Sequence, residues 1–325
     1  MRTFPSKLAI QLIAALTFGL FAASVSAEGR PITIIVPYPA GGGTDTIARN
    51  LGRLLQPVLD QPILIENITG AGSRIAHQTL MRAPPDGHKL LLTTSDLSIN
   101  QALRKSPPWN IDKDFTHIAN LGDAAIVYVV NAKVPVKDMR EFLAYAKQQA
   151  SKGTPVNYGS GGIGSILHLP TLELAAKHKL EMTHVPYRGA VPLVQDLSGG
   201  VIEFGVVNPV NAIGRDGTIR ALAITGANRH PMIPSVPTMT ESGFPDVNTT
   251  SLVELIGPAK MPAEVTKRLQ GALQKVVTTE AFRSAMLSAG IEPGWAIDDE
   301  LQRLLRSDLK KWEELARTSG VALED

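Results

Sequence analysis

The segment Ile32-Thr-Ile-Ile-Val-Pro-Tyr-Pro-Ala-Gly-Gly-Gly-Thr-Asp-Thr-Ile-Ala-Arg49 decides the fold of this chain. Its β-branched start is typical of a short buried strand, which the two prolines end. Gly41 to Gly43 can then adopt backbone angles that other residues avoid, and they expose their N–H groups. We expect Thr44 or Asp45 to cap the helix that follows. Strand, glycine turn and helix N-terminus together predict a binding site for a small anion.

Residues 1–27 have the pattern of a secretory signal peptide. Arg2 and Lys7 give a positive start, a mostly apolar run follows, and Val25-Ser26-Ala27 is a small-residue cleavage site. A transmembrane anchor is the alternative, but the apolar run is shorter than the ~20 residues that span a bilayer. We therefore expect cleavage after Ala27 and an exported, soluble, periplasmic protein.

The composition excludes several classes of function. Removal of Arg2 and Lys7 lowers the basic residues from 32 to 30, which equals the number of acidic residues. The mature chain is therefore formally neutral and has no basic run, so nucleic acid is not an expected partner. The chain has no cysteine, which excludes a disulfide, a thiol nucleophile and a thiolate metal site.

Strand-like and helix-like segments alternate along the rest of the chain, which predicts βαβ units with parallel sheets covered on both faces. The expected strands are Ile32–Val36, Ile63–Glu66, Lys89–Thr93, Ile126–Val130, Val156–Tyr158, Met182–Val185, Phe204–Val207 and Ala221–Thr225. The expected helices are Thr46–Leu59, Ile75–Arg82, Met139–Gln149, Ile166–Lys177, Val191–Ser198, Pro262–Val277, Glu280–Ala289 and Asp298–Thr318.

Two places are expected to be crossings between lobes, one near Val129–Asn131 and one in the proline-rich stretch Pro231–Ser251. They predict a discontinuous first lobe of residues 28–129 and 250–325 and a second lobe of residues 130–249. The fold class is thus α/β, with two lobes and a ligand cleft between them.

A second glycine turn lies in Asn157-Tyr-Gly-Ser-Gly-Gly-Ile-Gly-Ser-Ile-Leu-His168, again between a short strand and a helix. If the two turns lie on opposite lobes, their N–H groups would hold a carboxylate from both sides of the cleft. The alternative is two unrelated loops that need glycine for tight turns. A third turn at Tyr187-Arg188-Gly189 offers Arg188 as an anion contact or as a solvated surface arginine.

Catalytic, cofactor and metal patterns are not met. The first turn lacks the lysine of a phosphate-binding Walker loop and the spacing of a dinucleotide-binding loop. Ser160 lacks the Gly-x-Ser-x-Gly context of a hydrolase nucleophile, because residue 158 is tyrosine. The histidines are scattered without a metal-binding pair. We expect no enzyme activity, no cofactor and no metal.

An ordered set of short motifs runs through the chain from Pro31 to its end. They are Val36-Pro-Tyr-Pro-Ala-Gly-Gly-Gly-Thr-Asp45, Glu66-Asn67 with Gly70-Ala-Gly72, Asp86-Gly87, Lys113-Asp-Phe115, Tyr158 to Ser165, Val185-Pro-Tyr-Arg-Gly189, Asp196-Leu-Ser-Gly-Gly200 and Val236-Pro-Thr238 with Glu241-Ser-Gly243. With this set the chain resembles the substrate-binding receptors of tripartite tricarboxylate transporters, the Bug family.

The resemblance implies a type II periplasmic binding protein that holds a small carboxylate through backbone N–H groups and bridging waters and passes it to two membrane subunits. We expect a monomer. The candidate ligand-binding residues are Tyr38, Ala40, Gly41, Gly42, Gly43, Thr44 and Asp45 in the first turn, Ser160, Gly161, Gly162, Gly164, Ser165 and His168 in the second, and Arg74, Ser95, Tyr187, Val207 and Asn208 elsewhere.

Three departures from the family pattern concern the ligand's charge. Arg74 follows Gly72-Ser73 where relatives commonly have a neutral residue, Val207 stands where an acid is common, and Asp96 is an added acid. A gained arginine and a lost acid near the cleft would favour a dicarboxylate and disfavour amino acids. Asp96 can instead pair with Arg74, which would cancel that gain.

The sequence thus predicts a receptor that captures a small mono- or dicarboxylate for a membrane transporter. A receptor that presents its ligand to a sensor kinase is an alternative that the sequence does not separate from it. A secreted hydrolase that acts on a carboxylate is the rival from another class, but it lacks a recognisable nucleophile and base.

Overall fold

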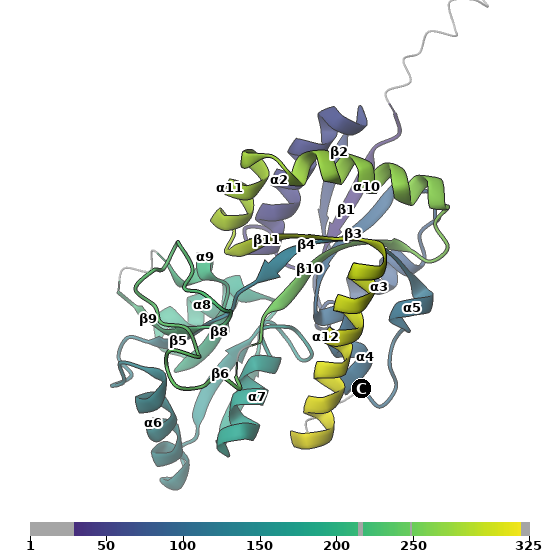
Figure 1. Ribbon diagram of the computed structural model, residues 1–325. Helices are drawn as coiled ribbons and strands as arrows, with labels where there is room; N and C mark the ends of the chain where they lie inside the picture. Colours follow the sequence, from purple (N-terminus) through teal and green to yellow (C-terminus); the bar gives the residue numbers. More distant parts are fainter. Residues whose placement is uncertain (1–28, 214–216, 248, 320–325) are drawn as a thin grey trace, which may run out of the picture.

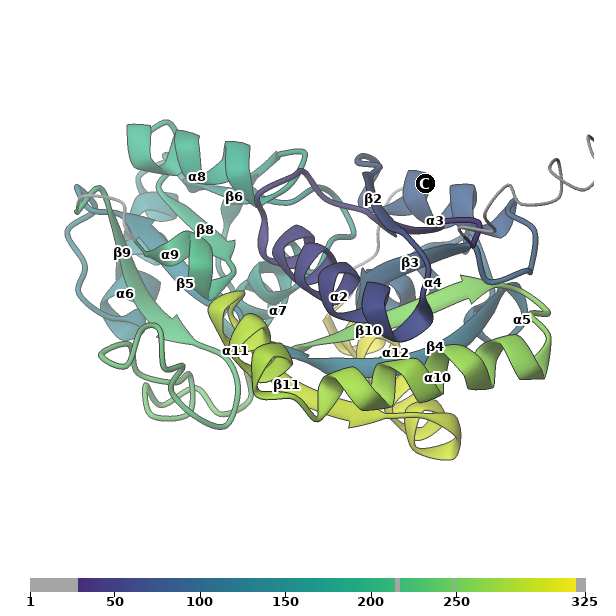
Figure 2. The ribbon, with the colours of Figure 1, turned by 90° about the horizontal axis from the view of Figure 1, so that it is seen from above.

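The computed structural model describes residues 29–213, 217–247 and 249–319, which form two α/β lobes (Figure 1). Seen at right angles, the molecule is elongated, with one sheet and its helices toward each end (Figure 2). The expected signal peptide lies outside the described residues. Within these ranges, none of the helices combines the length and the apolar character needed to cross a bilayer.

The first lobe is built on a six-stranded sheet. From edge to edge, its strands are β11 (Ile291–Ala296), β4 (Phe115–Ala124), β10 (Ser251–Pro258), β3 (Lys89–Thr94), β1 (Ile32–Val36) and β2 (Ile63–Asn67). Strand β1 is parallel to β2 and β3, whereas β10 is antiparallel to β3 and β4, and β11 to β4. The prediction of a parallel sheet is therefore wrong here, because two strands from the C-terminal part of the chain complete it.

Helices cover both faces of this sheet (Figure 1). One face carries α2 (Gly43–Leu59), α10 (Ala263–Val277) and α11 (Glu280–Ser288), and the other carries α3 (Arg74–Met81), α4 (Asp96–Leu103), α5 (Ile111–Asp114) and α12 (Asp298–Ser319). Successive strand residues point to opposite faces. Ile34 and Leu255 accordingly pack in the α2 side, while their neighbours Ile35 and Ile256 pack in the α3 side. This sheet is therefore buried on both faces.

The second lobe is built on a five-stranded sheet. Its strands, in order, are β7 (Met182–Pro186), β6 (Val156–Ser160), β8 (Phe204–Val207), β5 (Val127–Asn131) and β9 (Ile219–Ile224), with helices α6 (Met139–Ser151), α7 (Leu169–His178), α8 (Ala190–Gly199) and α9 (Pro209–Ala212) around them. Strand β6 is parallel to both neighbours, but β5 is antiparallel to β8 and β9. This sheet is mixed as well, contrary to the prediction.

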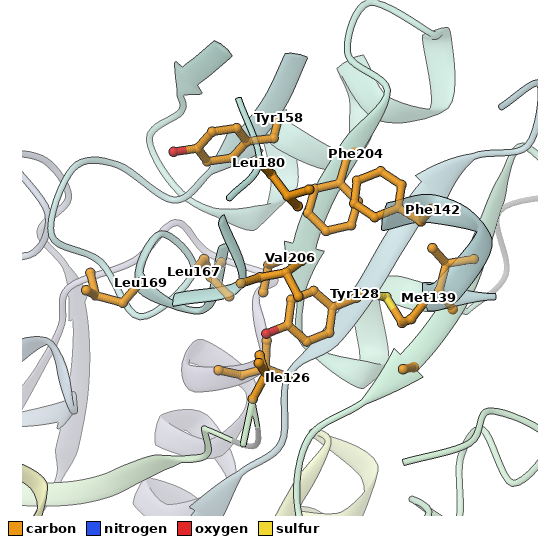
Figure 3. Packing of buried hydrophobic residues seen from close by; sticks show 14 of the residues in the cluster. Ile126, Tyr128, Met139, Phe142, Tyr158, Leu167, Leu169, Leu180, Phe204 and Val206 are labelled. Atoms are coloured by element: carbon orange, nitrogen blue, oxygen red, sulfur yellow. The ribbon is translucent and has the colours of Figure 1, made fainter. Parts of the chain in front are cut away.

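Stacked aromatic rings lie among aliphatic side chains in the core of the second lobe (Figure 3). Phe142 of α6 lies nearly parallel to Phe204 of β8, with ring centroids 4.1 Å apart and an interplanar angle of 14°. Tyr128 of β5 stacks on Phe204 at 6.1 Å. These contacts hold α6 against the sheet, since buried aromatic rings contribute large apolar contact areas.

The chain changes sheets twice. It leaves the first sheet after Ala124 and enters the second at Val127, and it returns between Ile224 and Ser251. The expected boundary between residues 129 and 130 falls inside β5, so the change of sheet precedes it. The assignment of the remaining residues to lobes stays a prediction. Helix α12 lies where the lobes join, because Trp312 packs in one cluster with α4 and the second-lobe core.

Candidate functional site

The first glycine turn joins β1 to α2. Gly41 has a φ of +84°, a left-handed conformation that favours glycine. Helix α2 begins at Gly43, and its N-cap residue Gly42 has no side-chain cap, so the prediction that Thr44 or Asp45 caps the helix is wrong. The N–H groups of the first helical turn have no partner within the helix and carry the positive end of its dipole. This end of α2 is therefore suited to an anion.

Asp45 stabilises the turn rather than capping the helix. Its Oδ2 accepts hydrogen bonds from Gly41 N and from Arg49 Nε, both at 2.9 Å, and its Oδ1 accepts one from Asn67 Nδ2 at 2.9 Å. Burial alone would raise the pKa of this carboxyl, but the hydrogen bonds from Arg49, Gly41 and Asn67 outweigh burial and lower it. Asp45 therefore stays charged and is occupied within the turn.

A small cavity of about 30 Å³ lies between the lobes at the start of α2. Its polar wall residues are Tyr38, Thr44, Thr94, Asn208 and Ser251, and the others are Pro39, Gly42, Gly43, Ala124, Ile126, Ile166, Leu167, Ala190, Val191 and Ile291. An N–H-rich helix start, a few neutral polar groups and apolar walls suit a small anion with an apolar body.

The second glycine turn uses its own polar groups internally. Gly162 N donates to Ser160 Oγ at 3.1 Å, Gly164 N to His168 Nδ1 at 3.4 Å, and Ser165 N to Gly162 O at 3.1 Å. The cavity is lined instead by the two residues that follow this turn, Ile166 and Leu167. The first turn thus lines the cavity directly. The second turn contributes only the two residues that follow it.

His168 lies in a stack of rings inside the second lobe. Its ring centroid is 4.1 Å from that of His184, and Tyr158 stacks on the same pair. Burial, with a smaller contribution from His184, lowers the pKa of His168 to about 3, and burial lowers the pKa of His184 to about 4. Both rings are neutral at pH 7, and His184 Nε2 lies 2.7 Å from Ser160 Oγ. Ser160 and His168, which were each predicted to bind the ligand, therefore support the turn.

The two lobes are in close contact around the cavity. A Cβ added to Gly72 of the first lobe would lie 2.1 Å from Ile163 O of the second, and one added to Gly189 would lie 2.6 Å from Pro39 Cδ. Real Cβ atoms do not come this close to other atoms, so neither glycine has room for a side chain. The structure is therefore a closed form, with glycine required where the lobes meet.

Asp96, at the start of α4, also joins the lobes. Its side chain is fully buried, its Oδ1 accepts a hydrogen bond from Ile166 N at 2.5 Å, and its Oδ2 accepts one from Tyr38 OH at 2.5 Å. Burial raises the pKa of Asp96 to about 6, although the bonds from Tyr38 and Ile166 act in the opposite direction. Asn100, one turn later, donates to Gly164 O at 3.4 Å. These bonds link α4 to the second lobe.

Arg74 does not pair with Asp96. Its Nε donates to Ala71 O at 3.2 Å, and the side chain lies with Arg188 at a separate, open pocket of about 340 Å³. The predicted residues Gly161, Gly162 and Tyr187 also line this outer pocket. The interpretation that Arg74 and Asp96 form an ion pair is therefore wrong.

The remaining predicted residues take different positions. Asn208 lines the cavity, but Val207 packs in the apolar core of the second lobe and forms no cavity wall. Ser95 is buried and links α4 to β10, since its N–H donates to Ser251 Oγ and its Oγ accepts from Leu252 N, both at 3.1 Å. Ala40 and Gly41 are exposed.

Sequence reasoning missed much of the cavity wall. Ile126 lies where the chain passes from the first sheet to the second, Ile291 begins β11, and Ser251 begins the returning strand β10. Isolated apolar residues in strands carry no signal of a binding role, because nearly all such residues are core. Within residues 29–213, 217–247 and 249–319, no group of His, Asp and Glu is arranged to hold a metal ion.

Comparison with known proteins gives one consistent result. A family model described as the tripartite tricarboxylate transporter family receptor matches residues 47–321. The protein BugT of Bordetella pertussis is 31% identical over 310 residues, which cover 93% of this chain and 94% of that protein.

Solved structures of similar proteins agree with this match. The periplasmic binding protein BugD is 28% identical, with a TM-score of 0.84 over 91% of this chain and 99% of the other. MatC from Rhodopseudomonas palustris, with bound malate, is 29% identical, with a TM-score of 0.81 over 88% of this chain and 98% of the other. A second R. palustris protein, with adipate, is 27% identical, with a TM-score of 0.84 over 91% and 99% of the chains.

Proposed function

Because this chain belongs to the tripartite tricarboxylate transporter receptor family, we propose that it captures a small carboxylate between its lobes and delivers it to a membrane transporter of that type. In this proposal the chain is an exported periplasmic protein, acts as a monomer and has no catalytic role. Similar proteins with bound malate and adipate support a carboxylate as the ligand.

The observation that carries the proposal is the start of α2 at the closed cavity. The uncapped N–H groups that follow Gly42 lie beside that cavity, and its walls exclude most water. Charge-assisted hydrogen bonds to backbone N–H groups are strong in such surroundings. A carboxylate placed at Gly42 to Thr44 would satisfy these donors, and the lobes would close over it.

A substitution in the turn tests this placement. Gly42 has φ −78° and ψ 169°, an extended conformation that valine adopts readily, so Gly42→Val should fold. Its side chain would occupy the space next to the helix start. We expect the affinity for the best carboxylate of a calorimetric screen to fall by at least about tenfold, or ~1.4 kcal/mol.

Gly271→Val is the matched control, because no atom lies within 4 Å of a Cβ at this exposed position on α10. It should bind like the wild type. Equal affinities in the Gly42 and Gly271 variants would remove the first turn from the ligand site. A screen in which no small carboxylate binds the wild type would contradict the function itself.

A further inference from the structure

We propose that Asp96 is a carboxylate supplied by the protein itself to the second half of the ligand site, so that the receptor selects small monocarboxylates over dicarboxylates. The inference rests on the proposed function and specifies the ligand class of the same cavity. It narrows the predicted mono- or dicarboxylate to a monocarboxylate, against the dicarboxylate that Arg74 and Val207 would favour.

Several backbone donors opposite the first turn are already occupied. The N–H groups of Gly162, Gly164 and Ser165 donate to acceptors within the second turn. The next donor along the chain, Ile166 N, lies at the cavity wall and donates to Asp96 Oδ1 at 2.5 Å. A second ligand carboxylate that sought this donor would have to displace a buried carboxylate.

Asp96 also uses the polar groups that lie between it and the cavity. Tyr38 and Thr94 both line the cavity, and Tyr38 OH donates to Asp96 Oδ2. Since the phenol has a single proton, the Thr94 hydroxyl, 2.8 Å away, must donate to the Tyr38 oxygen. Both groups are thus oriented by Asp96 and present no free proton to a second anion.

Charge acts in the same direction as hydrogen bonding. Asp96 is fully buried, and its hydrogen-bonding partners Tyr38 and Ile166 are neutral. Like charges repel strongly where water is excluded. Arg74, the cation expected to offset such repulsion, lies at the outer pocket with Arg188. A dicarboxylate would therefore place its second charge near an uncompensated carboxylate.

The walls of the cavity suit the other end of a monocarboxylate. Away from the start of α2 they consist mainly of Ile126, Leu167, Val191 and Ile291. Asn208 adds a neutral amide that can bind a hydroxyl or keto oxygen. One charged end at α2 and a short, largely apolar body match the chemistry of these walls.

Butyrate and succinate are matched probes, because they have the same chain length and differ in a methyl group against a carboxylate. Calorimetry at pH 7.5 would compare them on the wild type, Asp96→Asn and Asp96→Ser. The asparagine removes the charge but keeps an acceptor for Ile166 N, and the serine removes both charge and reach. Asp60→Asn is the control, since Asp60 is exposed at the far end of α2, about 25 Å from Gly43.

We expect the wild type and Asp60→Asn to bind butyrate at least about tenfold more tightly than succinate. In both Asp96 variants succinate should gain affinity, more in Asp96→Ser, and the preference should shrink to about twofold or reverse. Succinate bound as tightly as butyrate by the wild type overturns the inference but leaves the carboxylate receptor intact. An unchanged preference in a folded Asp96 variant also overturns it. If neither probe nor any other carboxylate binds any variant, the proposed function has failed.

Discussion

The buried pair of His117 and Glu254 should make the stability of the first lobe depend on pH. His117 Nδ1 lies 2.6 Å from Glu254 Oε1, and its Nε2 lies 2.8 Å from Ile111 O. The two side chains are only 5% and 3% exposed, so solvent screens the pair little. Burial alone would lower the pKa of His117, but the charge of Glu254 and the hydrogen bonds raise it to about 9.

The sign and size of the effect follow from this shift. In the unfolded chain a histidine titrates near 6.5, so the folded state holds the proton more tightly. The stabilisation is fully present below about pH 6.5 and is lost as pH rises through about 9. The rise in the pKa of His117 from about 6.5 to about 9 contributes ~3 kcal/mol to the free energy of unfolding at low pH.

Glu254→Gln tests this reasoning, because it keeps an acceptor beside the ring but removes the charge that raises the pKa of His117. Urea denaturation between pH 6 and 9.5 should show a wild-type loss of ~3 kcal/mol and a much flatter curve for the variant. Glu264→Gln, at an exposed site on α10, should retain the wild-type slope. Parallel curves for the wild type and Glu254→Gln would refute the assignment of the slope to this pair.

Two further predictions concern closure and export. Gly72→Ala should hold the lobes apart, because its Cβ would lie 2.1 Å from Ile163 O. It should weaken carboxylate binding at least about tenfold. It should also abolish the decrease in radius of gyration that X-ray scattering detects when the ligand binds. Gly153→Ala is the control, since it carries a similar positive φ with no atom within 4 Å, and equal effects of the two variants would attribute the loss to backbone strain. For export, mass spectrometry of protein from the native host should find a chain that begins at Glu28, and an intact N-terminus would contradict the signal peptide.

The parts of the fold that sequence predicted are those with strong local signals. The bounds of β1 and β8 agree with the expected Ile32–Val36 and Phe204–Val207, since both are short, mostly apolar and mostly buried runs. Strands β4, β10 and β11 were missed. Strand β4 contains His117, Asn120 and Asp123, and β11 contains Pro293 and Gly294, so neither shows a period of two. These strands pair with one another, and no local sequence pattern reveals that pairing.

The candidate site also contains residues with a strong local sequence signal and residues without one. The first turn was predicted because glycines after a strand and before a helix constrain the backbone locally. Asp96 was noticed as an unusual acid, but its partner Ile166 is 70 residues away, so no local pattern could identify the bond. Val207 was predicted at the cleft from the family resemblance, but in β8 its side chain packs in the core.

The position of β10 has a consequence for the order of folding. This strand lies between β3 and β4, and its Val253 pairs with Thr94, so the sheet that begins with residue 32 is continuous only after residue 258 is available. The strands of the second sheet all lie between residues 127 and 224. Pairing between distant segments is slow, and domains tend to fold as the chain emerges. We therefore expect the middle of the chain to fold first during synthesis, and the lobe that contains the N-terminal strand to be completed last.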